Sequence, residues 1–227
     1  MLVGNHDGGY LAPDGICLGV AWHERFEFKR PLFFLMHDLP FRIARPLTEW
    51  LHRLGIRAAS HHTLEKVFAQ GDSLLVYPGG AYEAFRGFWQ RRSISLGHRT
   101  GFVAQALKQR VPITPVASVG GHETLLVLAR GHALAKRFAL VKKLRSDVLP
   151  LWLGLPWGIG FGPMPHIPLP AKISVRLLEP IRLWRELGET ANPDDPHVRR
   201  AGFEIVRRRI ESAVGELYDQ RRWPIIG

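Results

Sequence analysis

The residues at the start of the chain have types and a spacing that suit acid–base chemistry. Asn5 and His6 end a short apolar run, and Asp14 follows eight residues after the histidine. A neutral imidazole can take the proton of a substrate hydroxyl when a carboxylate holds its other ring nitrogen and stabilises the charged form. His6 is therefore a candidate general base, and Asp14 is a candidate for its partner.

Two glycines decide whether these side chains can meet. On a continuous helix His6 and Asp14 would lie about 12 Å apart. Gly8 and Gly9 permit positive φ angles, so we expect a loop that folds Asp14 back towards His6. Asp14 also has a simpler interpretation, as the N-cap of a helix over residues 15–22, and both interpretations can hold together.

A second candidate site is the segment LLVYPGGAYEAFR, residues 74–86. A strand that runs into Pro-Gly-Gly and then into a short helix brings backbone N–H groups to the strand end, where an oxygen-rich group can approach. Glu83 and Arg86 could share a helix face there, or form an ordinary surface ion pair of little value. No Gly-Lys-Ser/Thr follows, so the segment is not a P-loop.

The segment RVPITPVASVGGHETLLVLARG, residues 110–131, predicts a strand that ends in Gly120 and Gly121. It follows a helical stretch, which favours a neighbouring parallel strand that contributes a wall to the same site. Ser118 does not fit a nucleophile elbow, because Gly-x-Ser-x-Gly needs glycine where Val116 stands. This disfavours a serine hydrolase.

The positioning elements are expected from alternating apolar and turn-rich stretches. Strands are predicted at residues 32–36, 73–78, 111–118 and 172–178, and helices at 48–54, 64–70, 101–109 and 196–218. Gly71 is placed as a left-handed cap after the second of these helices. We predict one α/β domain over residues 1–227, with a mostly parallel or mixed buried sheet flanked by helices.

Composition limits the chemistry and the partners. The chain is 46% hydrophobic and 22% charged, with a net charge of +11, which favours anionic partners such as phospholipid headgroups, phosphorylated substrates or nucleic acid. Cys17 is the one cysteine, so a reducing compartment is expected. We interpret it as a small buried hydrophobe. The histidines lack ligand spacing, His61 and His62 being adjacent, and we predict no metal.

Two segments suggest a membrane surface as a partner. Residues 149–170 carry no Lys, Arg, Asp or Glu, but six prolines rule out a spanning helix. Strands and loops with exposed Trp152, Trp157 and Phe161 are expected instead, able to enter a membrane interface or, alternatively, to cap the core. Residues 132–145 interleave basic and apolar residues as an interfacial helix or a solvated basic helix face would; the basic residues are Lys136, Arg137, Lys142, Lys143 and Arg145.

Together, NHDGGYLAPD, YPGGAYEAFR and VPITPVASVGG resemble the glycerolipid acyltransferase superfamily, which includes the lysophosphatidic acid acyltransferases. The Pro-Gly-Gly segment looks more like the diacylglycerol acyltransferase branch and its bacterial relatives. The resemblance covers nearly the whole chain and implies an acyltransferase-like fold. It implies transfer of a fatty acyl group from an acyl thioester, carried on coenzyme A or acyl-carrier protein, to a hydroxyl of a glycerolipid or lipid alcohol.

By this resemblance His6 matches the catalytic base and Asp14 its partner. The usual family spacing, His-x-x-x-x-Asp, falls on Leu11, so Asp7 is the alternative to Asp14. Gly79, Gly80, Glu83 and Arg86 match the acceptor-binding motif and are expected substrate contacts. Arg57 is the available match for an arginine of the family.

The phosphate-binding form of the motif, Pro-Glu-Gly-Thr-Arg, is absent, which favours a neutral acceptor. No cofactor is implied besides the thioester co-substrate, and the expected location is peripheral, on the cytoplasmic side of the membrane. Because family members carry further sequence before the histidine motif, we expect the N-terminal part to be missing.

Three other functions are compatible with parts of the sequence. A nucleic-acid-binding module would explain the basic charge and VRRAGFEIVRRRIE, but no stacking motif or helix-turn-helix pattern supports it. A lipid hydrolase would use the same His–Asp pair with water as the acceptor. An inactive lipid-binding relative is the third alternative.

Overall fold

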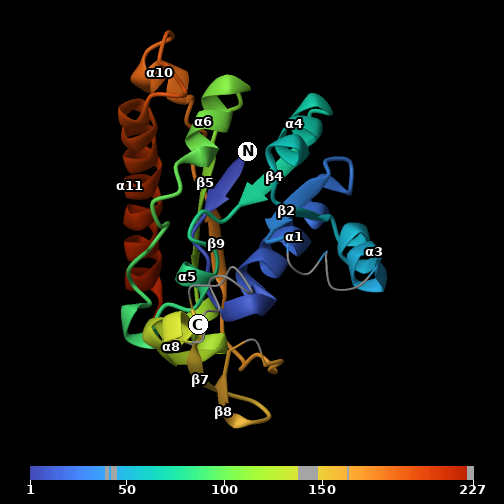
Figure 1. Ribbon diagram of the computed structural model, residues 1–227, viewed down its shortest axis with the longest axis vertical. Helices are drawn as coiled ribbons and strands as arrows, with labels where there is room; N and C mark the ends of the chain where they lie inside the picture. The colour runs from blue at the N-terminus through green and yellow to red at the C-terminus, as the bar shows by residue number, and fades with distance from the viewer. Residues whose placement is uncertain (39–40, 42–44, 138–147, 163, 224–227) are drawn as a thin grey trace.

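A six-stranded sheet forms the centre of the domain (Figure 1). The computed structural model describes residues 1–38, 41, 45–137, 148–162 and 164–223. In spatial order the strands are β3 (Ile56–Ala58), β2 (Leu32–Met36), β4 (Ser73–Val76), β1 (Leu2–Gly4), β5 (Thr114–Val119) and β9 (Ser174–Leu177). The first five run parallel, and β9 pairs antiparallel with β5 at one edge. The predicted α/β fold with a mostly parallel sheet is confirmed.

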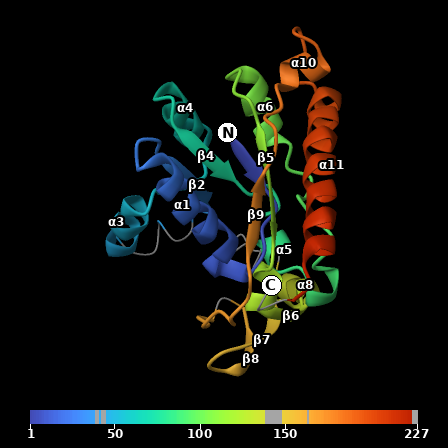
Figure 2. The ribbon, with the colours of Figure 1, turned by 180° about the vertical axis from the view of Figure 1, so that it is seen from behind.

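Helices cover both faces of this sheet (Figures 1 and 2). The longer helices are α1 (Pro13–Phe26), α3 (Arg45–Arg53), α4 (His61–Ala69), α6 (Gly101–Lys108) and α11 (Pro196–Gln220). The short ones are η1 (Gly9–Leu11), α5 (Gly80–Ala84), η2 (Phe88–Gln90), α7 (Gly121–Thr124), α8 (His132–Arg137) and α10 (Leu183–Leu187). Each predicted strand and helix has a counterpart within a few residues of its expected bounds.

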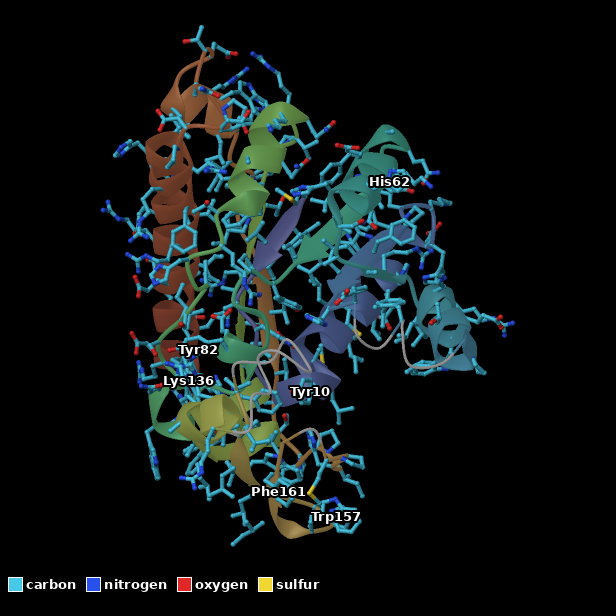
Figure 3. The ribbon with its side chains drawn as sticks, viewed as in Figure 1. Tyr10, His62, Tyr82, Lys136, Trp157 and Phe161 are labelled. Carbon is cyan, nitrogen blue, oxygen red and sulfur yellow. The ribbon has the colours of Figure 1, made fainter. Side chains whose placement is uncertain are left out.

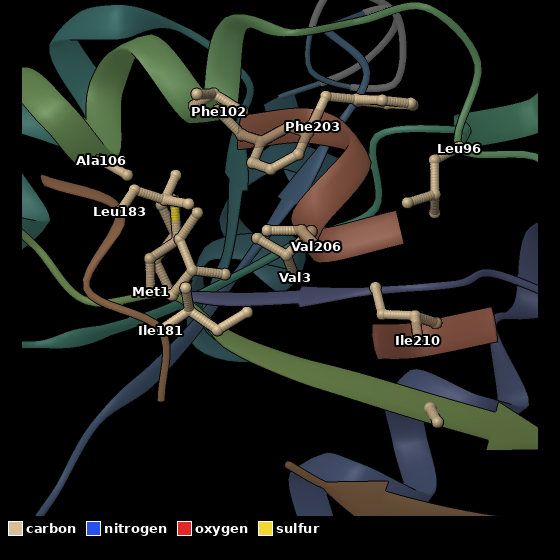
Figure 4. Packing of buried hydrophobic residues seen from close by; sticks show 14 of the residues in the cluster. Met1, Val3, Leu96, Phe102, Ala106, Ile181, Leu183, Phe203, Val206 and Ile210 are labelled. Carbon is tan, nitrogen blue, oxygen red and sulfur yellow. The ribbon is translucent and has the colours of Figure 1, made fainter. Parts of the chain in front are cut away.

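Successive side chains along a strand point to opposite faces of the sheet, so the hydrophobic core has one part on each face. Val3, Leu74 and Ala117 point to the side covered by α4, α6 and α11, and Figure 4 labels Val3 among the residues of this cluster. Their neighbours Leu2, Leu75 and Val116 pack with Leu18 of α1 on the other side. The predicted apolar stripe of α11 supplies Phe203, Val206, Ile210 and Val214 to the first of these clusters, with Leu217 packed against it.

A second, smaller sheet is an antiparallel meander of β6 (Leu126–Ala129), β7 (Leu151–Gly154) and β8 (Gly158–Phe161). The described residues of the segment 149–170 thus form strands and turns, as predicted. Trp157 and Phe161 are exposed. Trp152 is not exposed, so the expectation of a membrane-facing side chain was wrong there and the alternative of a place in the core holds. Its indole is fully buried in a cluster with Phe85 and Leu125, because side chains alternate across the strand and position 152 faces inwards.

The predicted basic helix over residues 132–145 is described only in part. Helix α8 ends at Arg137, and residues 138–147 lie outside the described residues. Within the described part of the chain, no helix combines the length and the apolar character that crossing a membrane requires.

Candidate active site

The candidate site lies at the carboxyl ends of three adjacent parallel strands, where α/β sheets commonly bind ligands. His6 follows β1, Tyr77 follows β4, and Gly120 follows β5. Asn5 ties two of these strand ends together. Its side chain accepts from the N–H of Ser118 and donates to the carbonyl of Ser118, both at 2.9 Å. These two bonds extend the β1–β5 pairing by one residue and hold the chain that presents His6.

The loop after His6 folds back as the glycines predict. Gly8 and Gly9 have φ angles of 79° and 72°, in the left-handed region. Asp14 is the second residue of α1, where a carboxylate also meets the positive end of the helix dipole. The expected N-cap role of Asp14 was wrong, because α1 begins at Pro13, two residues earlier than that role requires, and its N-cap is Ala12.

This loop gives a prediction about stability. Gly8→Ala should lower the free energy of unfolding by more than the roughly 1–3 kcal/mol that a strained residue costs, because the new Cβ would lie 2.5 Å from Pro13 Cγ. Gly71→Ala is the matched control, since Gly71 has φ of 76° but open space around a Cβ. Urea denaturation of both variants measures the difference. Equal losses would show that Gly8 serves the backbone angle alone.

His6 and Asp14 meet directly. The Nδ1 atom of His6 lies 3.2 Å from Oδ2 of Asp14, and the side chain of Asp14 is fully buried while that of His6 is 12% exposed. With the Nδ1 proton donated to Asp14, Nε2 carries the lone pair. The ring of Tyr77 stacks on the imidazole, with centroids 4.4 Å apart and planes inclined by 12°. The imidazole is therefore held on an edge and on a face.

Burial and the two neighbouring carboxylates act in opposite directions on His6. Burial lowers the pKa of its imidazole, while the charge and hydrogen bond of Asp14 and the charge of Glu83 raise it. Arg86 opposes them, but the net pKa lies above the ordinary value of 6.5. Burial, with smaller contributions from Asp14 and Asp7, also holds the pKa of Tyr77 well above its ordinary value, so the phenol keeps its proton.

Asp7 occupies a different position from the one expected of a partner of His6. Its backbone N–H donates to Oδ2 of Asp14 at 3.3 Å, and its buried carboxyl group packs against Gly121, where a Cβ would be 2.4 Å from Oδ1. Burial raises the pKa of Asp7 well above its usual range, and the charge of Asp14 adds to this. Asp7 thus supports Asp14 through the backbone, and the structure pairs the imidazole with Asp14.

Glu83 and Arg86 form a buried ion pair. Oε1 of Glu83 lies 3.3 Å from Nη1 of Arg86 and accepts from the N–H of Ser95 at 2.9 Å, and the two side chains are 0% and 2% exposed. The alternative of a surface pair was wrong, because α5 turns this face into the interior. Arg86 also donates from Nε to the carbonyl of Gln90 at 3.2 Å. In this arrangement the side chains of Glu83 and Arg86 hold together the loops around His6.

Positions 79 and 80 require glycine for two different physical reasons. A Cβ on Gly79 would lie 2.4 Å from Oε2 of Glu83 and 2.5 Å from the carbonyl oxygen of Ser95, so no side chain fits there. Gly80 has φ of 50° and begins α5. Because Gly79 has no side chain, Glu83 can fold over the Pro-Gly-Gly turn.

Two other sequence candidates lie away from this arrangement. Arg57 is on β3, separated from β1 by β2 and β4, and donates to carbonyls of His52 and Ile56. Cys17 is exposed, so the interpretation as a buried hydrophobe was wrong; partial desolvation and Asp14 raise the pKa of its thiol. No cluster of His, Cys, Asp or Glu within the described ranges could hold a metal ion.

Sequence reasoning missed Tyr77 and Asn5 as parts of the site. Each lies beside a residue that was singled out, one position before Pro78 and one before His6. Tyr77 and Asn5 each stand at a strand end, two and three residues before a pair of glycines, and this position could have indicated both. Their contacts with His6 and Ser118 depend on which strands are neighbours, which spacing along one chain does not give.

Comparison with known proteins places this geometry in a family. The family model described as diacylglycerol acyltransferase matches residues 21–198, a range that contains Gly79, Gly80, Glu83 and Arg86 but begins after Asp14. Uncharacterized proteins of Mycobacterium bovis and Mycobacterium tuberculosis are each 29% identical over 98% of this chain and 58% of their own length. One from Mycobacterium leprae is 28% identical over 98% of this chain and 57% of its own length.

The chain thus spans little more than half the length of the curated relatives it matches. No solved structure gives a significant match. The family model covers most of the chain, and the expected branch of the acyltransferases is the one it describes. The chain belongs to the diacylglycerol acyltransferase family.

Proposed function

We propose that this protein transfers a fatty acyl group from an acyl thioester to a hydroxyl of a glycerolipid or lipid alcohol. Membership of the family supports an acyltransferase that acts on lipids. The observation that carries the finer proposal is the contact between His6 Nδ1 and Asp14 Oδ2 at the carboxyl end of β1. This contact fixes the Nδ1 proton on the side of Asp14 and leaves Nε2 as the basic nitrogen.

In the proposed reaction the acceptor hydroxyl attacks the thioester carbonyl carbon and gives its proton to Nε2 of His6. Asp14 stabilises the imidazolium that forms, and backbone N–H groups stabilise the oxyanion. The carbon–sulfur bond then breaks, and the leaving thiolate takes the proton back from His6. An ester and a free thiol result, so neither a metal nor a redox cofactor enters the balance.

The proposal assigns Glu83, Arg86, Gly79 and Gly80 to shaping the acceptor side of the site. Their burial supports an indirect role for the two charged side chains, which hold the Pro-Gly-Gly turn and the segment at Ser95. The proposed donor is acyl-coenzyme A or acyl-carrier protein. A neutral acceptor is preferred, because the phosphate-binding motif Pro-Glu-Gly-Thr-Arg is absent.

The pH dependence of the rate tests the proposed base. His6 works as a base only when its imidazole is neutral, and the pKa of this imidazole lies above 6.5. The plot of kcat/KM against pH should therefore have a rising limb with its midpoint above pH 6.5. In Asp14→Asn the limb should move down, because burial then acts on the imidazole without its largest opposing cause. Thioester consumption measured from pH 5 to 9 gives both limbs. A limb unmoved in the variant would contradict the assignment.

We also propose that the protein acts as a peripheral protein on the cytoplasmic side of a membrane. The small sheet supports this, because one of its faces carries large exposed side chains: Leu151, Leu153, Ile159 and Phe161 (Figure 3 labels Phe161 and, at the tip, Trp157). Leu151 pairs with Phe161 and Leu153 with Ile159, so the apolar groups form a continuous patch. Patches of this kind mark interaction sites.

Charge favours an anionic bilayer as the occupant of this patch. By sequence, residues 124–171 contain six basic residues against a single acidic one, Asp147; Arg130, Lys136 and Arg137 lie in the described part of the chain, and Lys142, Lys143 and Arg145 lie outside it. Each basic residue near an anionic lipid surface contributes about 1 kcal/mol. A second copy of the chain would instead bring like charges together, since each copy carries +11.

Vesicle binding tests the membrane proposal. Phe161→Ser should weaken binding to vesicles of phosphatidylglycerol and phosphatidylcholine by about tenfold, the loss expected for one large apolar group. Phe28→Ser is the matched control, because Phe28 is 76% exposed but lies in the turn after α1. Co-sedimentation with vesicles measures both. Equal binding by the two variants would rule out this patch.

A further inference from the structure

A polar groove opens beside the Pro-Gly-Gly turn, and one of its lining residues is Ser95, whose N–H donates to Glu83. It has a volume of about 600 Å³, within the range of small-molecule sites. Its walls come from the turn and α5, from the segment before α6, and from α11. The lining residues are Gly79, Tyr82, Ile94, Ser95, Leu96, Gly97, His98, Arg99, Arg200, Phe203, Glu204 and Arg207. Figure 3 labels Tyr82 beside α11.

The lining carries three arginines and one carboxylate. Glu204 forms ion pairs with both Arg207, at 2.8 Å, and Arg200, at 3.5 Å, so its negative charge is already balanced. Arg207 is further neutralised by Glu211. Among the residues that the structure describes, Arg99 has no carboxylate partner. The groove is therefore positive on the side where Arg99 lies.

Arg99 is placed by the motif itself. Its Nη1 atom lies 3.4 Å from the carbonyl oxygen of Pro78 and 2.9 Å from where a Cβ on Gly80 would be. The absence of a side chain at Gly80 thus lets the guanidinium rest on the turn while its other donors stay exposed. Across the groove, Nη1 of Arg200 is 3.5 Å from Nδ1 of His98, which holds a second cation over the same space.

A guanidinium with free donors beside a second cation suits a phosphate ester, because its fork geometry matches phosphate oxygens. The buried floor formed by Leu96 and Phe203 suits an attached organic group. The groove also has a physical connection to the candidate site. Glu83 accepts from Ser95 in the groove wall, and its charge acts on the imidazole of His6.

We infer that this groove binds the phosphorylated end of a substrate, with Arg99 and Arg200 as the phosphate ligands. The choice of the two ligand classes below rests on the proposed function. One source is the nucleotide of coenzyme A, whose 3′-phosphate would enter the groove. The other source, which the absence of Pro-Glu-Gly-Thr-Arg disfavours, is the phosphate of a phosphorylated lipid acceptor.

Equilibrium binding tests the inference without requiring turnover. Calorimetry on the full chain compares coenzyme A with 3′-dephospho-coenzyme A, and hexanoyl lysophosphatidic acid with monohexanoylglycerol below their micelle concentrations. In the parent, one phosphorylated ligand should bind about tenfold or more tightly than its partner without the phosphate. Arg99→Gln and Arg200→Gln should each remove that preference. The pair of ligands that shows it identifies the source.

The control is Arg110→Gln, because Arg110 is paired with Glu189 away from the groove. It should keep the preference, and thermal melting should show that all variants fold. The inference is overturned if neither ligand pair shows a phosphate preference, or if the preference survives in Arg99→Gln and Arg200→Gln. Failure of acyl transfer is a separate result, because a protein without that activity would still bind the phosphate through Arg99.

Discussion

His6→Ala should lower kcat for acyl transfer by about 10²–10⁴-fold, the contribution of a positioned general base. The variant removes the one imidazole that contacts both Asp14 and Tyr77, and no other described histidine stacks on Tyr77. KM for both substrates should change much less, because the imidazole acts on the proton in the transition state. Steady-state rates with an acyl-coenzyme A and a lipid alcohol measure the effect.

His62→Ala is the matched control for this variant. His62 is exposed on α4 (labelled in Figure 3) and is not among the residues that contact His6, Asp14 or Tyr77 in the described part of the chain, so its loss should leave the rate unchanged. Unchanged melting temperatures for both variants would exclude unfolding as the cause of a lower rate. Full activity of folded His6→Ala would remove the proposed mechanism.

Asp14→Asn should lower kcat by about 10²–10⁴-fold, since an amide can no longer hold the reactive tautomer or stabilise the imidazolium. Asp7→Asn should have a far smaller effect. Burial raises the pKa of Asp7 well above its usual range, which favours the uncharged form of its carboxyl group, and the amide of Asn has a similar shape. Its backbone N–H, which donates to Asp14, is retained in the variant.

The comparison of these two variants separates the two carboxyl groups. Rates at one pH, with the fold checked by circular dichroism, are sufficient. A larger loss in Asp7→Asn than in Asp14→Asn would reverse the assignment, and equal large losses would mean that the carboxyl groups act as a unit.

The sequence predicted well the features that follow from local periodicity. Buried strands such as 32–36 and the stripe on α11 repeat with the period of their structure, so their type and their buried face can be read directly. The reversal between His6 and Asp14 was predictable from local sequence as well, because Gly8 and Gly9 can adopt the positive φ angles that such a turn requires. The family, too, was evident from motifs.

Other features depend on contacts between distant segments and were not predictable. Whether Glu83 and Arg86 are buried depends on α5 facing inwards, and this depends on Gly79 and Ser95. Trp152 and Phe161 have similar local sequences but opposite exposure, because strand register decides which one faces Phe85. Asp14 was misread as an N-cap because helix ends are uncertain by a residue or two.

The most direct test of the central claim is product identification. The protein is incubated with an acyl-coenzyme A and a panel of lipid alcohols and glycerides, and the ester, the free fatty acid and the free thiol are quantified by mass spectrometry and thiol titration. We predict a new lipid ester with one thiol released per ester, and loss of both in His6→Ala. Release of free fatty acid without an ester, or no thiol release by the folded parent protein, would contradict the account.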